Sequence, residues 1–216
     1  MLLKKLIKNL SPKTSTLKIT GISQDSRKVK KGYLFVALKG EKYDGNKYIP
    51  QAISNGARAV IYSGKIKKNK KTEFINFKDT RNIFASLSAN YYKNKPKNIV
   101  AVTGTNGKTS VADFYFQILN LNKIKVASIG TLGINGINIR NKFSNTTFDT
   151  IQINKILQKL KEKKIENVIL EASSHGLNQN RLDGLKFDVG IFTNLSRDHL
   201  DYHKSYKNYL NSKLIL

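Results

Sequence analysis

The sequence predicts an α/β protein with two domains, of which the second is built on a doubly wound, mostly parallel sheet. Three observations support this prediction. Strand-like apolar segments alternate with segments of helical spacing, which is typical of parallel sheets covered by helices. A segment with a proline near its centre, residues 93–98, interrupts this alternation. A glycine-rich turn at residues 104–108 then joins a strand-like segment to a helix-like one.

The first domain contains a strand, a helix and a second strand. Residues 33–38 (YLFVAL) and 57–62 (ARAVIY) are compact apolar runs, which predicts two buried strands. Between them, residues 47–56 have helical spacing and end on Gly56, as helices commonly do. A lysine-rich loop follows, and residues 80–92 predict a further helix. These elements imply a small α/β domain.

The second domain begins after the break at Pro96, so we assign residues 1–95 to the first domain and 96–216 to the second. Its predicted strands are residues 99–103, 125–131, 166–172 and 187–194, and its predicted helices are residues 109–120 and 151–163. The chain ends at Leu216, in a helix that we predict to start after His203. Because a sheet of this kind normally continues, we expect a fragment whose second domain is incomplete.

The chain is strongly basic, with 39 Lys and Arg against 14 Asp and Glu and a formal net charge of +25. Clustered positive charge would favour nucleic-acid binding through counterion release. Here the lysines are spread along the chain, and the basic runs at 65–71 and 159–164 lack interleaved aromatic residues. We therefore expect no nucleic-acid partner. The alternative, electrostatic adherence to nucleic acid, predicts a steep salt dependence and no effect of ATP.

The composition also bears on the cellular compartment. The chain has no cysteine, which excludes disulfides, cysteine-based metal sites and thiol catalysis. Residues 1–10 interrupt their apolar runs with lysines, unlike a signal peptide. No apolar stretch approaches the roughly 20 residues that a membrane-spanning helix needs. We expect a cytoplasmic protein that does not bind membranes.

The strongest local motif is residues 103–110 (TGTNGKTS), between a predicted strand and a predicted helix. Glycines let backbone N–H groups approach phosphate oxygens, and the following helix presents its positive end. Lys108 can reach terminal phosphates and Thr109 can bind Mg²⁺. The usual phosphate-loop pattern needs a glycine at Val102, so this is a shorter variant; the alternative is a glycine-rich turn with a chance lysine. The expected nucleotide-binding residues are Gly104, Thr105, Asn106, Gly107, Lys108, Thr109 and Ser110.

Polar residues also follow the later predicted strands. Glu171 ends one strand and would project toward the loop, where a carboxylate suits Mg²⁺; the alternative is a solvated glutamate. His199 follows the last strand and could bind a second divalent ion or orient a neighbour; the alternative is a histidine that caps a helix. His203 is expected to be structural.

These residues resemble the Mur ligase family, whose ATP loop has the same shortened pattern. Further segments resemble the MurE type in particular, and together they extend over most of the chain. They are DSRKVKKGYLFVALKG at 25–40 with DG at 44–45, NTT at 145–147, EASSHGLNQNR at 171–181 and TNLSRDHLDYH at 193–203.

The resemblance implies a three-domain enzyme, of which this chain holds the UDP-precursor-binding first domain and part of the central ATPase domain. Such a ligase uses ATP to phosphorylate the D-glutamate carboxylate of UDP-N-acetylmuramoyl-L-alanyl-D-glutamate in peptidoglycan synthesis. The amine of the third amino acid, meso-diaminopimelate or lysine, then attacks the acyl phosphate. The resemblance also implies a monomer. The family reads its amino acid with the third domain, so we expect this chain alone to be inactive.

The resemblance assigns roles to individual residues. Thr109 and Glu171 would hold one Mg²⁺ and His199 a second. Lys213 would carry a CO₂-derived carbamate that joins the metal ligands; without the resemblance it would be interpreted as a solvated helix lysine. Lys108, Glu171, His199 and Lys213 form the expected catalytic set. The expected precursor-binding residues are Gln24, Ser26, Asn145, Thr146, Thr147, Ser173, Gln179 and Arg181, with Ser26 and Gln24 at the uridine end.

Two departures and two alternatives accompany this interpretation. Phe148 stands where the family commonly has proline, and residues 41–43 (EKY) occupy a substrate-contacting turn in an atypical way. Folylpolyglutamate and cyanophycin synthetases share the ATPase core, but the SSHGL and DHLDYH segments argue against both. A module that binds nucleotide or UDP-precursor without turnover is the alternative from another functional class.

Overall fold

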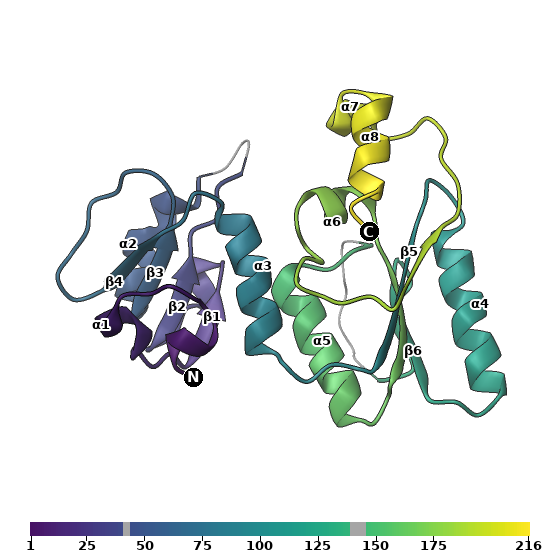
Figure 1. Ribbon diagram of the computed structural model, residues 1–216, viewed down its shortest axis with the longest axis horizontal. Helices are drawn as coiled ribbons and strands as arrows, with labels where there is room; N and C mark the ends of the chain where they lie inside the picture. The colour runs from purple at the N-terminus through teal and green to yellow at the C-terminus, as the bar shows by residue number, and fades with distance from the viewer. Residues whose placement is uncertain (41–43, 139–145) are drawn as a thin grey trace. The chain divides into compact units, whose positions relative to one another are not determined.

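The computed structural model describes residues 1–40, 44–138 and 146–216 (Figure 1). The chain divides into two compact units, Met1–Tyr91 and Tyr92–Leu216. The sequence predicted the domain boundary between residues 95 and 96, four residues after the division between Tyr91 and Tyr92. Among the described residues, no helix is both long enough and apolar enough to cross a membrane.

The described residues of the first unit form a four-stranded parallel sheet in the order β1-β2-β3-β4. The strands are β1 (Gly21–Ser23), β2 (Tyr33–Val36), β3 (Ala59–Tyr62) and β4 (Glu73–Asn76), and the helices are α1 (Pro12–Ser15), α2 (Ile49–Ser54) and α3 (Thr80–Tyr91), with short 3₁₀ helices at Leu3–Lys5, Ser26–Lys28 and Gly45–Tyr48. The sequence predicted β2, β3, α2 and α3. It missed β1 because that strand is only three residues long, and β4 because its residues are only partly buried.

The second unit has a five-stranded sheet in the order β7-β6-β8-β5-β9, counted over the described residues. The strands are β5 (Asn98–Thr103), β6 (Val126–Gly130), β7 (Gly133–Asn135), β8 (Asn167–Glu171) and β9 (Val189–Phe192), and the helices are α4 (Lys108–Leu121), α5 (Thr150–Glu162), α6 (Ser174–Asn178), α7 (Leu200–His203) and α8 (Tyr206–Lys213). All pairings are parallel except that of β6 with β7. The predicted doubly wound, mostly parallel sheet is confirmed, and β7 is an addition.

Alternating residues of this sheet pack against helices on its two faces. Ile99 and Ala101 of β5 belong to a buried cluster with Ile153 and Leu157 of α5. Val100 and Val102 belong to the opposite cluster, with Ala112 and other residues of α4. Side chains alternate between the faces of a strand, so a fully apolar strand needs a helix on each side. Figure 1 shows α4 and α5 on opposite sides of the sheet.

The strand register brings several carboxyl ends to one edge of the sheet. Val102 of β5 pairs with Glu171 of β8, and Thr103 pairs with Phe192 of β9. Ile129, next to the end of β6, pairs with Leu170. Ligands of open α/β sheets bind at this edge. The predicted loop and histidines follow strands that end there, and the predicted carboxylate, Glu171, is the last residue of β8.

Candidate functional site

The glycine-rich loop joins β5 to α4 and depends on glycine at two positions. Gly107, the N-cap residue of α4, has φ +83°, and Gly104 has φ +147°. Residues with a side chain rarely adopt these angles. A Cβ atom at Gly104 would also overlap the hydroxyl of Thr193, which follows β9. The glycines therefore allow the backbone to turn tightly in front of the positive end of α4.

Lys108 is the first residue of α4, and its side chain folds back over the loop. Its Nζ donates hydrogen bonds to the carbonyl oxygens of Gly104 and Thr105, both at 2.9 Å. Burial lowers the pKa of Lys108, and the charges of Glu171 and Asp198 partly offset that effect. The ammonium group therefore lies at the loop, where it can contact a phosphate bound there.

Glu171 ends β8 and is 2% exposed. Its carboxylate accepts hydrogen bonds from the Thr109 hydroxyl at 3.0 Å and from the Thr131 N–H and hydroxyl at 3.0 and 3.1 Å. A Cβ at Gly130 would overlap this carboxylate, so glycine makes room for it. The carboxylate is thus buried among neutral donors beside the loop, and the alternative of a solvated glutamate is wrong.

The oxygen atoms of Thr109 and Glu171 fit a magnesium ion. Mg²⁺ prefers hard oxygen ligands and usually takes one or two from the protein, with phosphates and water supplying the others. No group of three or more His, Asp or Glu side chains within the described ranges is arranged to hold a metal ion alone. A cation at this pair would therefore take its other oxygens from water or a bound ligand.

Lys213 is the last residue of α8 and is 2% exposed, so it is not a solvated lysine. Its Nζ donates to the carbonyl oxygen of Gly104 at 2.6 Å, the same oxygen that accepts from Lys108. Burial lowers the pKa of Lys213 to about 8, and the nearby charge of Lys108 adds to this effect. About one such amine in ten is therefore neutral and nucleophilic at pH 7.

His199 lies at the N-cap of α7 with φ +52°. Its Nε2 is 3.5 Å from Asp198 Oδ2, and its ring centroid is 4.8 Å from that of His175. These contacts place it in a histidine cluster with His175 of α6, and none of them is to the Thr109–Glu171 pair.

The other two histidines extend this cluster. His203 is buried, and its Nε2 lies 3.0 Å from the Ser174 hydroxyl in α6. Its ring centroid is 5.4 Å from that of His175. Burial and the charge of neighbouring histidines lower the pKa values of His175 and His203, which favours their neutral forms. The cluster links α6 to α7.

Several predicted precursor-binding residues form one hydrogen-bonded network beside Glu171. The Thr147 hydroxyl donates to the carbonyl oxygen of Glu171 at 3.0 Å and lies 2.9 Å from the Ser173 hydroxyl. Arg181 donates from Nη1 to the Thr147 carbonyl oxygen at 2.6 Å, and from Nε and Nη2 to Gln179 Oε1 at 3.1 and 2.8 Å. The guanidinium fork is therefore presented from a fixed position.

The segment before α5 continues this network. The Thr131 hydroxyl, which donates to Glu171, lies 3.1 Å from the Thr146 hydroxyl. Asn145, also predicted to bind precursor, lies outside the described residues. Phe148, which replaces the family's common proline, is 1% exposed and packs in the cluster beneath α5.

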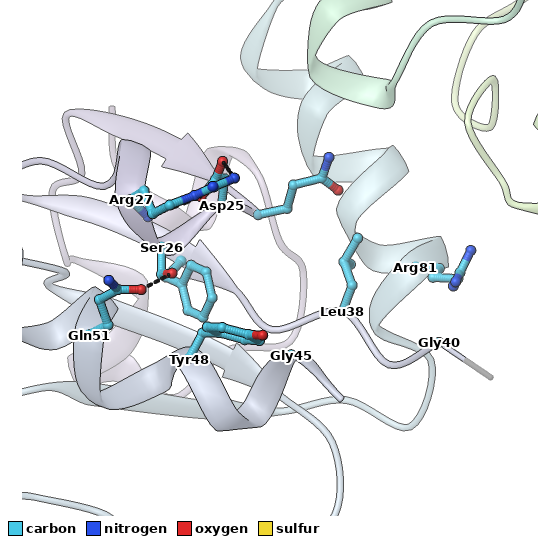
Figure 2. Close-up of a pocket in the computed structure, with 11 residues that line it drawn as sticks. Asp25, Ser26, Arg27, Leu38, Gly40, Gly45, Tyr48, Gln51 and Arg81 are labelled. Carbon is cyan, nitrogen blue, oxygen red and sulfur yellow. Dashed lines mark hydrogen bonds and ion pairs between the residues drawn. The ribbon is translucent and has the colours of Figure 1, made fainter. Parts of the chain in front are cut away.

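A cavity of about 470 Å³ lies in the first unit, at the carboxyl ends of β1 and β2. Figure 2 shows side chains from several elements around it. It is lined by Gln24, Asp25, Ser26, Arg27, Phe35, Leu38, Gly40, Gly45, Tyr48, Gln51 and Arg81. The two predicted residues Gln24 and Ser26 are thus brought together with others that the sequence analysis did not select.

Polar side chains of this cavity are held by neighbours. The Ser26 hydroxyl donates to Gln51 Oε1 at 2.6 Å, and the Arg27 guanidinium lies 3.0 Å from Asp25 (Figure 2). The hydrogen bond from Arg27 lowers the pKa of Asp25. Arg81 donates from Nε to the carbonyl oxygen of Lys39 at 3.1 Å. The atypical residues 41–43 lie outside the described ranges.

Sequence reasoning missed Thr131, Gln51 and Arg81. Thr131 belonged to the end of a predicted strand, and its position after a glycine was the available signal. Gln51 and Arg81 lay on predicted helices, where polar residues are ordinarily solvated.

Two family descriptions match the chain. "Mur ligase family, catalytic domain" matches residues 18–92, and "Mur ligase middle domain" matches residues 102–216. Two curated relatives carry the name UDP-N-acetylmuramoyl-L-alanyl-D-glutamate--2,6-diaminopimelate ligase. The Rhizobium meliloti relative is 42% identical over 94% of this chain and 42% of its own length. The Syntrophomonas wolfei relative is 40% identical over 100% of this chain and 45% of its own length.

Solved structures agree with these matches. A structure of a ligase with the same name has a TM-score of 0.79 and 31% identity, over 97% of this chain and 42% of that one. The MurF ligase of Thermotoga maritima, solved in complex with ADP, has a TM-score of 0.57 at 23% identity, over 90% of this chain and 42% of that one, which shows a shared fold. The chain spans less than half the length of the curated relatives named above.

Proposed function

The chain belongs to the Mur ligase family, and we propose that it supplies the precursor-binding and ATP-binding parts of a peptidoglycan-precursor ligase. The proposed substrate is UDP-N-acetylmuramoyl-L-alanyl-D-glutamate, and the names of the relatives favour 2,6-diaminopimelate over lysine as the added amino acid. The observation that carries the proposal is the buried Glu171 carboxylate bonded to Thr109 at the glycine-rich loop.

The proposed reaction has two steps. The D-glutamate carboxylate attacks the γ-phosphorus of ATP, which breaks the bond to ADP and forms an acyl phosphate. The amine of the amino acid then attacks the acyl carbon, and inorganic phosphate and a proton leave as the amide forms. Phosphoryl transfer depends mainly on positioning and charge stabilisation, and the loop with Lys108 would supply both for ATP.

Magnesium would be held by the oxygens of Thr109 and Glu171, and we propose His199 for a second ion. When bound, the ions neutralise charge on the phosphates. The network of Thr147, Ser173 and Arg181 lies next to Glu171, and would hold the D-glutamate end of the precursor near the loop. Arg181 can offer N–H groups to a carboxylate.

We further propose that Lys213 carries a carbamate. The ammonium group would first lose one proton. The neutral amine would then attack CO₂, form an N–C bond as one C=O π bond opens, and release a second proton, so that a buried cation becomes an anion. The lowered pKa of about 8 supports this, because about one amine in ten is then neutral at pH 7. A carbamate oxygen could join the metal ligands, which an ammonium group cannot.

The cavity of the first unit is proposed to hold the uridine end of the precursor. Its volume of about 470 Å³ and its aromatic residues, Phe35 and Tyr48, suit a nucleobase and sugar. Ser26 and Gln51 would offer a hydroxyl and an amide to the base.

Calorimetric titration of the chain with UDP-N-acetylmuramoyl-L-alanyl-D-glutamate tests the proposal. Arg181→Ala should weaken binding about tenfold or more, since hydrogen bonds to a charged group are lost. The matched control is Arg58→Ala, because Arg58 is exposed on the first unit. Failure of a folded chain to bind, or equal affinities for the two variants, would refute the assignment of the precursor site.

A further inference from the structure

Tyr209 lies in the second unit, where its side chain contacts Thr105 of the glycine-rich loop, Lys213 of α8 and His203 of α7. It belongs to α8 and is 0% exposed, which is unusual for a tyrosine. The sequence analysis gave it no role. Burial raises the pKa of its hydroxyl, so the group stays protonated and can donate a hydrogen bond.

The Tyr209 hydroxyl reaches into the glycine-rich loop, where it lies 2.9 Å from the Thr105 hydroxyl. The Thr105 Oγ1 atom also accepts from the N–H of Ser196 at 3.0 Å and lies 3.3 Å from the Ser196 carbonyl oxygen. A hydroxyl has one hydrogen and two lone pairs. All three contacts are satisfied when Thr105 donates to Ser196 and accepts from both Ser196 and Tyr209.

The Tyr209 ring contacts the other groups of the site. Lys213 Nζ lies 4.5 Å from its centroid, and the His203 ring is 5.3 Å away. A cation over an aromatic face is attracted to it. The Lys213 amine then donates to Gly104, the loop residue before Thr105. Tyr209 and Lys213 thus hold adjacent loop residues from the same helix.

We propose that Tyr209 is a positioning residue that holds the nucleotide loop at Thr105 in its ligand-binding arrangement and sets Lys213 beside it. The inference rests on the proposed binding of nucleotide at the loop. It also says that α8 and the loop act as one unit, because Tyr209 and Lys213 of that helix contact adjacent loop residues. Other anchors of the loop come from the segment after β9: Thr105 N–H donates to Asn194 O at 3.0 Å, Asn106 N–H donates to Asn194 Oδ1 at 3.0 Å, and the Thr193 hydroxyl donates to Asn106 O at 2.6 Å.

The first test is Tyr209→Phe, which keeps the ring and removes the hydroxyl. Titration with ADP and Mg²⁺ should show affinity weaker by about threefold to tenfold, the effect of one hydrogen bond. Tyr206→Phe is the matched control, since Tyr206 lies on the same helix and is 44% exposed. The pair Thr105→Val and Tyr209→Phe should be non-additive, because each removes the same bond.

A second measurement does not depend on nucleotide. Amide hydrogen exchange should accelerate at residues 104–107 in Tyr209→Phe and stay unchanged in β8, whereas global destabilisation would accelerate both. Equal exchange at residues 104–107 in Tyr209→Phe and Tyr206→Phe would overturn the inference. If wild type fails to bind ADP but shows this local acceleration, the proposed function fails and the positioning role stands. Should Tyr209→Phe not fold, Thr105→Val tests the same bond from the loop.

Discussion

At the scale of single residues, the site is built from polar groups that are buried rather than solvated. Glu171 is hydrogen bonded to two threonine side chains, and Lys213 donates to a backbone carbonyl beside Lys108. Burying a charge is costly unless its surroundings compensate. Such groups are candidates for function, because the fold holds them at a cost that a solvated residue would avoid.

Glu171→Gln should abolish the magnesium dependence of nucleotide binding and leave the fold intact. Glutamine has nearly the same shape: its Oε1 can accept from the Thr131 N–H, and its NH₂ group can donate to the hydroxyls of Thr109 and Thr131. It lacks the charge that attracts a divalent cation. ADP titration with and without Mg²⁺ measures this. Glu162→Gln, on the exposed surface of α5, is the control. A variant that still responds to Mg²⁺ like wild type would exclude Glu171 as a ligand.

Lys213 should make stability depend on pH in a defined direction. Its pKa is lowered from 10.5 to about 8, so between these values the unfolded chain binds more protons than the folded chain. Stability contributed by Lys213 therefore rises as pH increases through this window. Urea unfolding in CO₂-free buffer at pH 7, 8.5 and 10 should show wild type gaining stability relative to Lys213→Met. The exposed Lys207→Met should show no such trend.

At the scale of elements, α5 connects the fold to the site. A capping box begins it: Asp149 accepts from the N–H of Gln152 at 2.8 Å, and Gln152 accepts from the N–H of Asp149 at 3.2 Å. Phe148, Thr147 and Thr146 precede this cap directly. The helix start thereby helps to fix the backbone that carries two predicted precursor-binding residues.

Asp149→Ala should lower the free energy of unfolding by about 1 kcal/mol, the usual effect of losing an N-cap. It should also weaken precursor binding, because Thr147 would be held less firmly. Chemical denaturation and calorimetry measure the two effects. Lys159→Ala, in the exposed face of the same helix, should change neither. Lost stability with unchanged precursor affinity would show that the cap does not position Thr147.

At the scale of the whole molecule, each unit has its own sheet and its own buried clusters. The cavity residues of the first unit lie between residues 24 and 81, and the loop network lies between residues 103 and 213. The described contacts of each candidate binding region therefore lie within one unit.

We predict that residues 1–91 fold without residues 92–216. The first unit buries Phe35, Val60 and Tyr62 within its own cluster, and its sheet pairs only its own strands among the described residues. Circular dichroism and a cooperative thermal transition of the isolated segment measure this. The control is Val60→Asp, which should abolish the transition by burying a charge. A wild-type segment that is disordered would show that the second unit is needed.

The sequence by itself determined the two-domain α/β class, most of the helices and buried strands, and the glycine-rich loop. These features depend on local patterns, namely apolar periodicity and glycine in a strand-to-helix turn. The roles of all the predicted site residues, Asn145 and His199 among them, stay predictions. Only the tertiary structure decided that Lys213 is buried, that Thr131 contacts Glu171 and that Tyr209 reaches Thr105. Those contacts join residues far apart in the chain. They are set by strand register and helix packing, and local sequence patterns do not encode either.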